Sequence, residues 1–408
     1  MSQTPSAIQP AVDPIDQPES TALPALIPLL AIAAGLSVAN LYYNNPLLKL
    51  MAQSFGVSEE AIGIIPTITQ IGYAIGMLLI VPLGDILQRR KLIPALLGLV
   101  AVAVIAAATA QNLVWLALAS LSIGIFTCVP QILLPFAAKV SSPAQRGKAL
   151  GTVMMGLLLG ILLSRTLSGF VGHYFGWRAM YYMAAVLVSI LSLSLSRLLP
   201  EHELSTKLTY GGLIKSVGQL VLDEPILRQA MLNGALLFAA FSAFWATLVF
   251  RMKTPPFHYG ETAAGMFGLV GAAGALVAPH VGRLASRHGP RAVITFSSAM
   301  ILLSYGIFWV GGSTLIGIGI GVILMDMAVQ GAQVSNQTRI YALSSHAHSR
   351  VNSAFMVSYF LGGAAGSLVA SKAWKIAQWN GVCAVAAGFS VLALIAHLLA
   401  KSKAGGGA

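Results

Sequence analysis

The sequence predicts an all-α, multi-pass membrane protein with twelve transmembrane helices in two pseudo-symmetric six-helix bundles. Three observations lead to this prediction: charged residues are scarce, long apolar segments recur along the chain, and its two halves share a motif. Of the 408 residues, 57% are hydrophobic and only 9% are charged, whereas soluble domains carry about 25% charged residues. So few charges cannot cover a water-facing surface, which argues against a soluble globular enzyme.

Twelve apolar segments are long enough to cross a bilayer, which takes roughly 20 apolar residues. They occupy residues 24–47, 61–83, 91–110, 114–138, 149–171, 178–197, 229–250, 263–281, 291–310, 314–338, 351–371 and 380–400. A charged stretch separates the first six from the last six. We therefore expect an N-terminal six-helix bundle at 23–197, a cytoplasmic linker at 198–228 and a C-terminal six-helix bundle at 229–400. Residues 1–22 and 401–408 are expected to be cytoplasmic tails, the first of them disordered because it is rich in proline and acidic residues.

Lysine and arginine are distributed unevenly between alternate loops. With the N-terminus placed inside, the cytoplasmic loops and tail hold 17 of the 24 basic residues and the opposite loops hold 6. Because basic loops remain in the cytoplasm, both termini are expected there, with the protein in the plasma (inner) membrane and surrounded by lipid. The net charge of +12 is then a mark of topology. The basic residues form no stripe with an aromatic RNA-reading motif, so nucleic acid is not an expected partner.

The two halves of the chain repeat the same loop motifs. VPLGDILQRRKLI (81–93) aligns with VGRLASRHGPRAVI (281–294) at an offset of 201 residues, which pairs Arg90 with Arg291. QRGKALG (145–151) aligns with SRVNSAF (349–355) at an offset of 204 residues. Both offsets are about half the chain. Two parallel halves related by an axis along the membrane normal are therefore expected.

On these motifs the chain resembles the major facilitator superfamily over essentially its whole length. The signature G-x-L-A-D-R-x-G-R-R/K is matched in the second half by Gly282, Leu284, Ala285, Arg287, Gly289 and Arg291. The first half matches it with Leu83, Gly84, Asp85, Arg89 and Arg90 but has Val81 and Gln88 at two glycine positions. The resemblance implies a cytoplasmic gate that latches the halves together in the outward-facing state. The alternative is a solvated turn whose arginines only set topology.

The fifth span resembles that of the bacterial drug/proton antiporter-like branch. Residues 151–169 read GTVMMGLLLGILLSRTLSG, where Gly156 and Gly160 form a small-xxx-small pair that permits close helix approach. The Gly-Pro pair typical of that branch is replaced here by Ser164 and Arg165.

Two ionisable residues lie deep inside the predicted spans, namely Asp326 and Arg165. Such residues are costly in a membrane and are functional by default. Asp326, Gln330, Gln333 and Gln337 follow at i, i+4, i+7 and i+11, so they share one helical face. The resemblance implies that spans 1, 4, 7 and 10 surround a central cavity, which makes Asp326 the expected proton-coupling residue, with Arg165 near it. A fixed Asp326–Arg165 pair and direct substrate binding are the alternatives.

Further polar and aromatic residues on the spans are expected to line the substrate cavity. On the first span, Ser37, Asn40 and Asn44 are spaced i, i+3 and i+7 on one expected helix face. On the seventh, Phe241 and Trp245 belong to an aromatic stripe, for which lipid contact or helix packing is the alternative explanation. The full set comprises Ser37, Asn40, Tyr43, Asn44, Gln70, Gln131, Asn233, Phe241, Trp245, Gln330 and Gln333.

Together these features predict a secondary active transporter of a small molecule that works by alternating access. The resemblance favours proton-coupled export of amphipathic compounds or metabolites, with proton-coupled uptake by symport as the alternative. A non-transporting ligand sensor and a membrane-embedded enzyme are more remote. GxxxxGK[ST] does not occur in the sequence, so ATP-driven pumping by this chain alone is excluded.

Neither a metal nor another cofactor is expected. The two cysteines, Cys128 and Cys383, form no CxxC motif, and His202, His346 and His348 lack a second pair of ligands. A monomer is expected.

Overall fold

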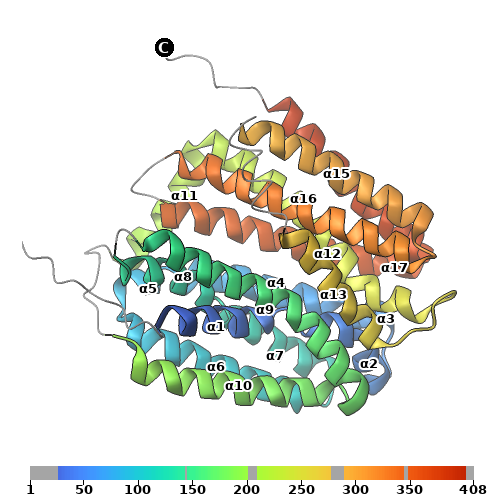
Figure 1. Ribbon diagram of the computed structural model, residues 1–408, viewed down its shortest axis with the longest axis horizontal. Helices are drawn as coiled ribbons and strands as arrows, with labels where there is room; N and C mark the ends of the chain where they lie inside the picture. The colour runs from blue at the N-terminus through green and yellow to red at the C-terminus, as the bar shows by residue number, and fades with distance from the viewer. Residues whose placement is uncertain (1–25, 143–144, 201–208, 277–288, 344–347, 401–408) are drawn as a thin grey trace, which may run out of the picture.

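The computed structural model describes residues 26–142, 145–200, 209–276, 289–343 and 348–400, except the side chains of 85, 272–276, 348 and 349. Every regular element in these ranges is a helix (Figure 1). The helices are α1 (Leu26–Ala39), α2 (Asn44–Phe55), α3 (Glu59–Ile62), α4 (Ile64–Leu79), α5 (Leu83–Ile86), α6 (Arg89–Ala108), α7 (Leu113–Phe126), α8 (Val129–Lys139), α9 (Arg146–Phe175), α10 (Trp177–Leu198), α11 (Tyr210–Asp223), α12 (Pro225–Lys253), α13 (Glu261–Leu276), α15 (Pro290–Gly311), α16 (Leu315–Tyr341) and α17 (His348–Leu399).

The predicted fold class is confirmed, and the twelve expected spans map onto these helices. Within the described ranges, ten stretches are long and apolar enough to cross a membrane. The last of them, Arg350–Leu399, contains two expected spans, because the backbone leaves the helical conformation at Ala377 and Gln378. Helix α13 supplies the described part of the span expected at 263–281. The two expected tails, together with His202 and His346, lie outside the described residues.

Two of the expected spans are broken, and the first continues beyond its expected end at residue 47 to Phe55. The first divides into α1 and α2 at residues 40–43, just before Pro46, and the fourth divides into α7 and α8 just before Pro130. Proline lacks an N–H group and disfavours helical geometry in the residue before it, although it is tolerated in the first turn of a helix. The expectation that Ser37, Asn40 and Asn44 share one continuous helix face is therefore wrong.

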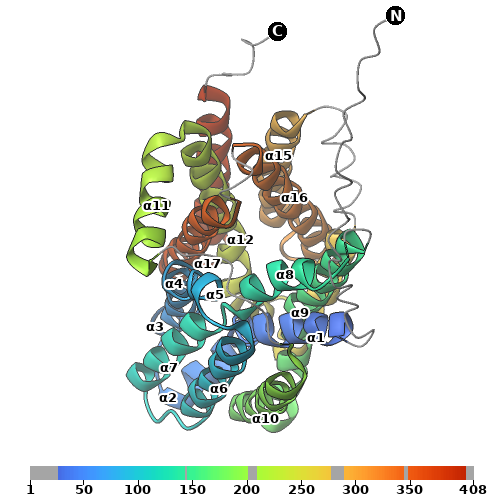
Figure 2. The ribbon, with the colours of Figure 1, turned by 90° about the vertical axis from the view of Figure 1, so that its left-hand side faces the viewer.

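The helices form two layers that correspond to the two halves of the chain. Helices α1 to α10 lie in one layer, and α11, α12, α15, α16 and α17 lie in the other (Figures 1 and 2). The layers meet where α13 packs on α9 and where α17 packs on α4. We call the end that carries residues 59–62 the α3 end and the end that carries residues 83–86 the α5 end. Figure 2 views the molecule from the α5 end, which the distribution of basic residues predicts to be cytoplasmic.

Glycines bring helix backbones into direct contact at several crossings. A β-carbon on Gly160 of α9 would lie 2.2 Å from the carbonyl oxygen of Gly35 on α1, and one on Gly156 would lie 2.2 Å from that of Ala31. The small-xxx-small pair therefore does permit the close approach expected of it. Between the halves, a β-carbon on Gly169 of α9 would lie 2.6 Å from the carbonyl oxygen of Glu261.

The stretch expected as a linker contains a helix of its own, α11. Thr209 caps it by accepting a hydrogen bond from the backbone N–H of Gly212. Leu213 and Val217 are buried on one face of the helix. Tyr210 donates a hydrogen bond to the carbonyl oxygen of Leu79 at 2.7 Å, which ties α11 to the end of α4. The connection between the halves is thus held against the α5 end.

Candidate functional site

The centre of the site is Arg165 on α9, whose side chain is completely buried. Its guanidinium carbon lies 3.8 Å from the ring centroid of Trp245, 4.9 Å from that of Tyr42 and 5.5 Å from that of Phe241. Tyr42 belongs to the turn between α1 and α2, and the other two rings belong to α12 of the second half. Aromatic faces attract a cation by about 2 kcal/mol where water is excluded. Both halves therefore build the surroundings of one charge.

Within the described part of the chain, the guanidinium of Arg165 has no counterion in contact with it. None of its three nitrogens has a hydrogen-bond partner among the described residues. Nor does a described carboxylate oxygen lie within the 4.0 Å of these nitrogens that would make an ion pair. A buried charge without a partner costs several kcal/mol, and the guanidinium presents five N–H donors in one plane. The site therefore offers donors that the described residues do not satisfy.

Asp326 on α16 is the nearby acidic group, and it is also buried. Its carboxylate packs against Gly271 of α13, where a β-carbon would lie 3.1 Å from Oδ2. Oδ2 has no hydrogen-bond partner among the described residues. The charges of Asp326 and Arg165 interact through space without forming an ion pair. The fixed pair considered as an alternative is thus not formed in this structure.

The polar stripe of α16 extends from Asp326 toward the α5 end. Gln330, Gln333 and Gln337 are half-buried, whereas Asp326 is buried. Gln337 donates to Asn352 on α17 at 3.2 Å, and the Nε2 of Gln333 lies 3.9 Å from the sulfur of Met356. The side chains of the stripe thus become more exposed toward the α5 end.

Asn233 does not belong to this stripe. It accepts a hydrogen bond from Asn336 of α16 at 2.9 Å and donates one to the carbonyl oxygen of Ala393 at 3.4 Å. Both asparagines are buried. The structure therefore places Asn233 in a tie between α12, α16 and α17 rather than beside Arg165.

The expected residues on α4 and α8 lie where the two halves meet. Gln70 donates to Ser367 on α17 at 3.1 Å and accepts from Ser242 on α12 at 3.3 Å. Gln131 lies 3.5 Å from the hydroxyl of Tyr73, and the Tyr73 ring packs 4.4 Å from that of Phe360 on α17. Gln70 therefore lies at the interface between the halves, and Gln131 is connected to that interface through Tyr73.

The polar residues expected on the first span make hydrogen bonds at or near the break between α1 and α2. Ser37 donates to the carbonyl oxygen of Thr127 at 3.4 Å, Asn40 donates to those of Leu36 and Ser37, and Asn44 donates to Thr69 at 3.2 Å. Tyr43 is buried. The residue of this segment that reaches Arg165 is Tyr42, which the sequence interpretation missed. The break before Pro46 changes which side chains point toward α9.

The aromatic stripe of α12 does not contact lipid. Phe241 is 7% exposed and Trp245 is 3% exposed, and both face Arg165. Phe238 stacks on Tyr359 of α17 with ring centroids 3.9 Å apart and on Phe241 with centroids 5.4 Å apart. Tyr359 was not expected from the sequence, because nothing local connects helices α12 and α17. The stripe thus forms one wall of the site.

Charged side chains close the molecule at the α3 end, which the sequence interpretation also missed. Lys375 at the end of the first part of α17 pairs with Glu60 at 2.5 Å. Trp374 donates to Glu59 at 2.7 Å, and Glu59 also pairs with Lys49. Glu59 and Glu60 belong to the first half, and Trp374 and Lys375 belong to the second. These contacts join the halves directly.

Glu261, the first residue of α13, provides a second junction at the α3 end. Its carboxylate is 3% exposed, lies 2.6 Å from Lys253 and lies 3.9 Å from His173 of α9. Since α9 belongs to the first half, this group also connects the halves near their α3 end.

The expected cytoplasmic gate is only partly described. The side chain of Asp85, and all of Gly282 and Arg287, lie outside the described residues. Arg89 donates to the carbonyl oxygen of Gly84 at 3.0 Å, and Arg291 donates to that of Ala400 at 2.6 Å. These two contacts lie within their own halves.

The other gate residues lie at the ends of helices. Arg90 lies in the first turn of α6. Gly289 precedes α15 with φ +82°, a conformation that favours glycine. A latch between the halves at this end stays a prediction.

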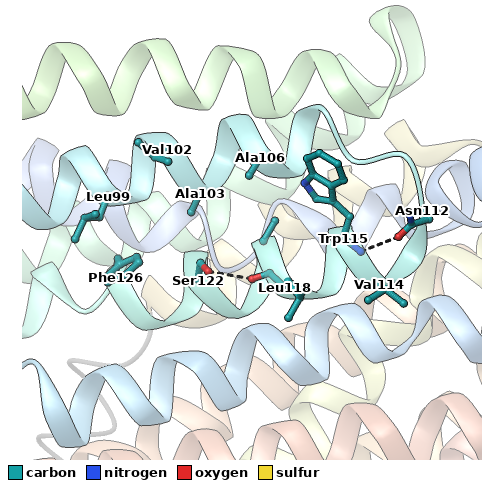
Figure 3. A pocket seen from close by; sticks show the side chains of 11 residues that line it. Leu99, Val102, Ala103, Ala106, Asn112, Val114, Trp115, Leu118, Ser122 and Phe126 are labelled. Carbon is teal, nitrogen blue, oxygen red and sulfur yellow. Dashed lines mark hydrogen bonds between the residues drawn. The ribbon is translucent and has the colours of Figure 1, made fainter.

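A groove of about 640 Å³ between α6 and α7 is separate from this site (Figure 3). Val102, Val114 and Leu118 line it and are more than 60% exposed. In a membrane such an apolar surface faces lipid. The groove carries none of the ionisable groups described above.

The sequence model of the Major Facilitator Superfamily matches residues 30–367. This chain belongs to the Major Facilitator Superfamily. It is 41% identical to the putative uncharacterized transporter YgaY of Escherichia coli (strain K12), over 93% of this chain and 96% of that protein. It is 35% identical to the probable transporter SCO4007 of Streptomyces coelicolor, over 92% of this chain and 87% of that protein.

The fold of this superfamily member is similar to that of solved transporters. A mutant form of the nucleoside transporter NupG superposes with a TM-score of 0.74 at 16% identity, over 91% of this chain and 98% of that one. A bacterial homolog of the human lysosomal transporter Spinster, in an inward-facing and unoccupied conformation, superposes with a TM-score of 0.71 at 15% identity, over 94% and 98%. The protein is a multi-pass membrane transporter and not an enzyme.

Proposed function

We propose that this superfamily member is a proton-coupled secondary transporter that moves a small molecule across the plasma (inner) membrane by alternating access. The observation that carries the proposal is the buried carboxyl of Asp326. It lies on the second half, within electrostatic reach of Arg165 on the first half. A membrane-buried acid facing a charge on the opposite half is the arrangement that a proton-coupled transporter needs.

Coupling follows from the dependence of protonation on surroundings. The proton affinity of a carboxyl changes with its burial and with its distance from a cation. Asp326 and Arg165 belong to different halves, so a rocking motion of 23–197 against 229–400 changes both quantities for Asp326. One state of the transporter then takes up a proton and the other releases it.

The gates of the cycle are proposed at the two ends. The contacts of Glu59, Glu60 and Glu261 hold the α3 end closed in this structure. The motif residues of the other end, with both termini in the cytoplasm, would latch the halves in the opposite state. Those residues are Asp85, Arg89, Arg90, Gly282, Arg287, Gly289 and Arg291.

Two directions of transport are in question. Export of amphipathic compounds or metabolites is what the resemblance to the antiporter-like branch favours. Proton-coupled uptake is the second candidate, and two observations favour it. The Gly-Pro pair of that branch is replaced by Ser164 and Arg165, and the Arg165 guanidinium has no hydrogen-bond partner among the described residues.

The proposal is tested with Asp326→Asn in proteoliposomes. A thermal-shift screen of small organic anions, cations and neutral compounds selects a solute, and its transport is then measured with and without an imposed pH gradient. We expect Asp326→Asn to lose gradient-driven accumulation while it retains exchange of the solute across the membrane. Asp223→Asn makes the same chemical change at the exposed end of α11 and serves as the control. Accumulation by Asp326→Asn equal to that of the unmodified protein would refute the coupling role.

A further inference from the structure

We infer that Arg165 binds an anionic substrate and that this anion is carried together with a proton. The inference rests on the proposed function, since it names the substrate class of the same site. It assigns to the transporter a small organic anion with an apolar or aromatic body.

The hydrogen bonding of Arg165 differs from that of two other arginines that stack on aromatic rings in this structure. Arg178 lies 4.2 Å from the ring of Trp177, and its guanidinium also donates to Ser54 at 3.0 Å and to the carbonyl oxygen of Ala110 at 2.8 Å. Arg251 lies 5.3 Å from the ring of Phe257 and donates to the carbonyl oxygen of Gly312 at 3.0 Å. Both guanidinium groups donate hydrogen bonds to the protein, whereas that of Arg165 has no hydrogen-bond partner among the described residues. Stacking therefore does not by itself explain Arg165.

The hydrogen-bond donors without partners around Arg165 favour a ligand that accepts hydrogen bonds. The indole N–H of Trp245, whose ring stacks on the guanidinium, is also buried without a hydrogen-bond partner among the described residues. Arginine and tryptophan side chains only donate hydrogen bonds. A ligand that meets both must present acceptor oxygens, and an oxyanion with two oxygens can bind a guanidinium through two parallel hydrogen bonds. A cationic ligand would instead be repelled by the positive charge of Arg165.

The surroundings also indicate the body of the ligand and its route. The rings of Tyr42, Phe241 and Trp245 surround the charge, so the part of the ligand next to the oxyanion meets apolar faces. The cavity that Trp245 lines together with Asn45 and Pro46 measures about 10 Å³, which is room for one water at most. The half-buried Gln330 and Gln333 lie toward the α5 end. Because an ion pair and a hydrogen bond join the halves at the α3 end, the α5 end is the side from which an anion would enter.

The position of Asp326 determines the sign of the coupling. Helix α13 lies against both residues: a β-carbon on Gly271 would lie 3.1 Å from Oδ2 of Asp326, and one on Gly268, three residues earlier, would lie 3.2 Å from Cβ of Arg165. The other titratable groups near Asp326 among the described residues are the phenols of Tyr305 on α15 and Tyr359 on α17. Phenols carry no charge between pH 5.5 and pH 8. An ionised Asp326 and a bound anion therefore share the field of one cation and repel each other. Protonation of Asp326 removes this repulsion and so raises the affinity for the anion. By thermodynamic linkage, the bound anion raises the affinity of Asp326 for the proton by the same factor.

Whether proton binding strengthens or weakens substrate binding distinguishes a symporter from an antiporter. A cationic substrate would compete with the proton, which is what antiport requires. An anion that binds together with the proton is carried in the same direction, which is symport. The geometry therefore points to symport of one anion with one proton.

The experiment measures binding of permanently charged probes to the purified full-length protein. Benzenesulfonate, neutral benzenesulfonamide and cationic benzyltrimethylammonium share an aromatic body and keep their charge at every pH used. We expect benzenesulfonate to bind at least tenfold more tightly than the other two probes. Arg165→Gln should lose this preference, whereas Arg178→Gln, which alters a stacked arginine at the α3 end, should keep it. If Arg165→Gln does not fold, Arg165→Lys keeps the charge but loses the forked donors and should bind benzenesulfonate at least fivefold more weakly.

The pH dependence tests the second part of the inference. The affinity for benzenesulfonate should fall about tenfold from pH 5.5 to pH 8 in the unmodified protein and should be independent of pH in Asp326→Asn. Equal binding of the three probes, no binding of benzenesulfonate, or unchanged binding in both Arg165 variants overturns the anion site. A pH-independent affinity in the unmodified protein overturns the symport.

The two proposals fail separately. If benzenesulfonate binding depends on Arg165 but Asp326→Asn still accumulates solute under a pH gradient, the anion site stands and the coupling role of Asp326 falls. If Asp326→Asn loses coupling but the neutral probe binds as tightly as the anion, coupling stands and the anion site falls.

Discussion

The contact between α9 and α13 makes Gly265→Ala a sensitive test of alternating access. A β-carbon at Gly265 lies 2.6 Å from the carbonyl oxygen of Arg165 and 3.3 Å from the α-carbon of Gly169. Optimal contact between such atoms requires 3.5 to 4.0 Å, so the two helices must separate by about 1 Å. Rotation of a side chain cannot relieve the clash, because both obstructing atoms belong to the backbone.

The size of the effect follows from the cost of overpacking. One extra methyl group in a close-packed contact costs about 1–3 kcal/mol, and here it acts only while α9 and α13 are in contact. The equilibrium between the state closed at the α3 end and the state open there should therefore shift by about 5- to 150-fold. The matched control is Gly98→Ala on α6, where a β-carbon meets nothing within 4 Å and only the helix propensity changes, by about 1 kcal/mol.

The shift can be measured by electron spin resonance distance distributions. Spin labels at Gln53 on α2 and His258 before α13 occupy exposed positions in the two halves at the α3 end. In Gly265→Ala the population with the longer distance should grow, while Gly98→Ala should match the unmodified protein. A folded Gly265→Ala protein with an unchanged distance distribution would refute the reasoning that this contact belongs to one state of the cycle.

Two further variants test how the halves are held. Lys375→Gln should change the fraction closed at the α3 end only slightly, corresponding to less than about 1 kcal/mol, because its ion pair with Glu60 is 66% exposed on the lysine side. A large shift in the same spin-label measurement would show that this pair is a main latch. Asn336→Ala leaves the buried Oδ1 of Asn233 without its donor and should reduce stability by about 1–3 kcal/mol, visible as a lower Tm in thermal unfolding, whereas an unchanged Tm would argue against the tie between α12 and α16.

Much of the fold was predictable because spanning a membrane is a local property. A segment of about 20 apolar residues crosses a bilayer whatever its neighbours are, and the loop charges predict the orientation of each span. The helix breaks before Pro46 and Pro130 are also local in origin, because proline removes one backbone donor. Their effect on neighbouring side chains was not predicted, so Tyr43 was expected in the cavity where Tyr42 contacts Arg165.

The amino-acid sequence alone determined that Asp326 and Arg165 are the ionisable groups deep within the spans, since burial of a charge stands out in an apolar segment. Only the tertiary structure decided what surrounds them. Trp245 and Tyr42 lie far from Arg165 in the chain. Tyr42 follows α1, which glycines bring into contact with α9, and Trp245 lies on α12 of the other half. The absence of a counterion near the Arg165 guanidinium among the described residues is likewise a property of packing. An unsatisfied donor depends on every neighbour in three dimensions, and no spacing along the chain contains that information.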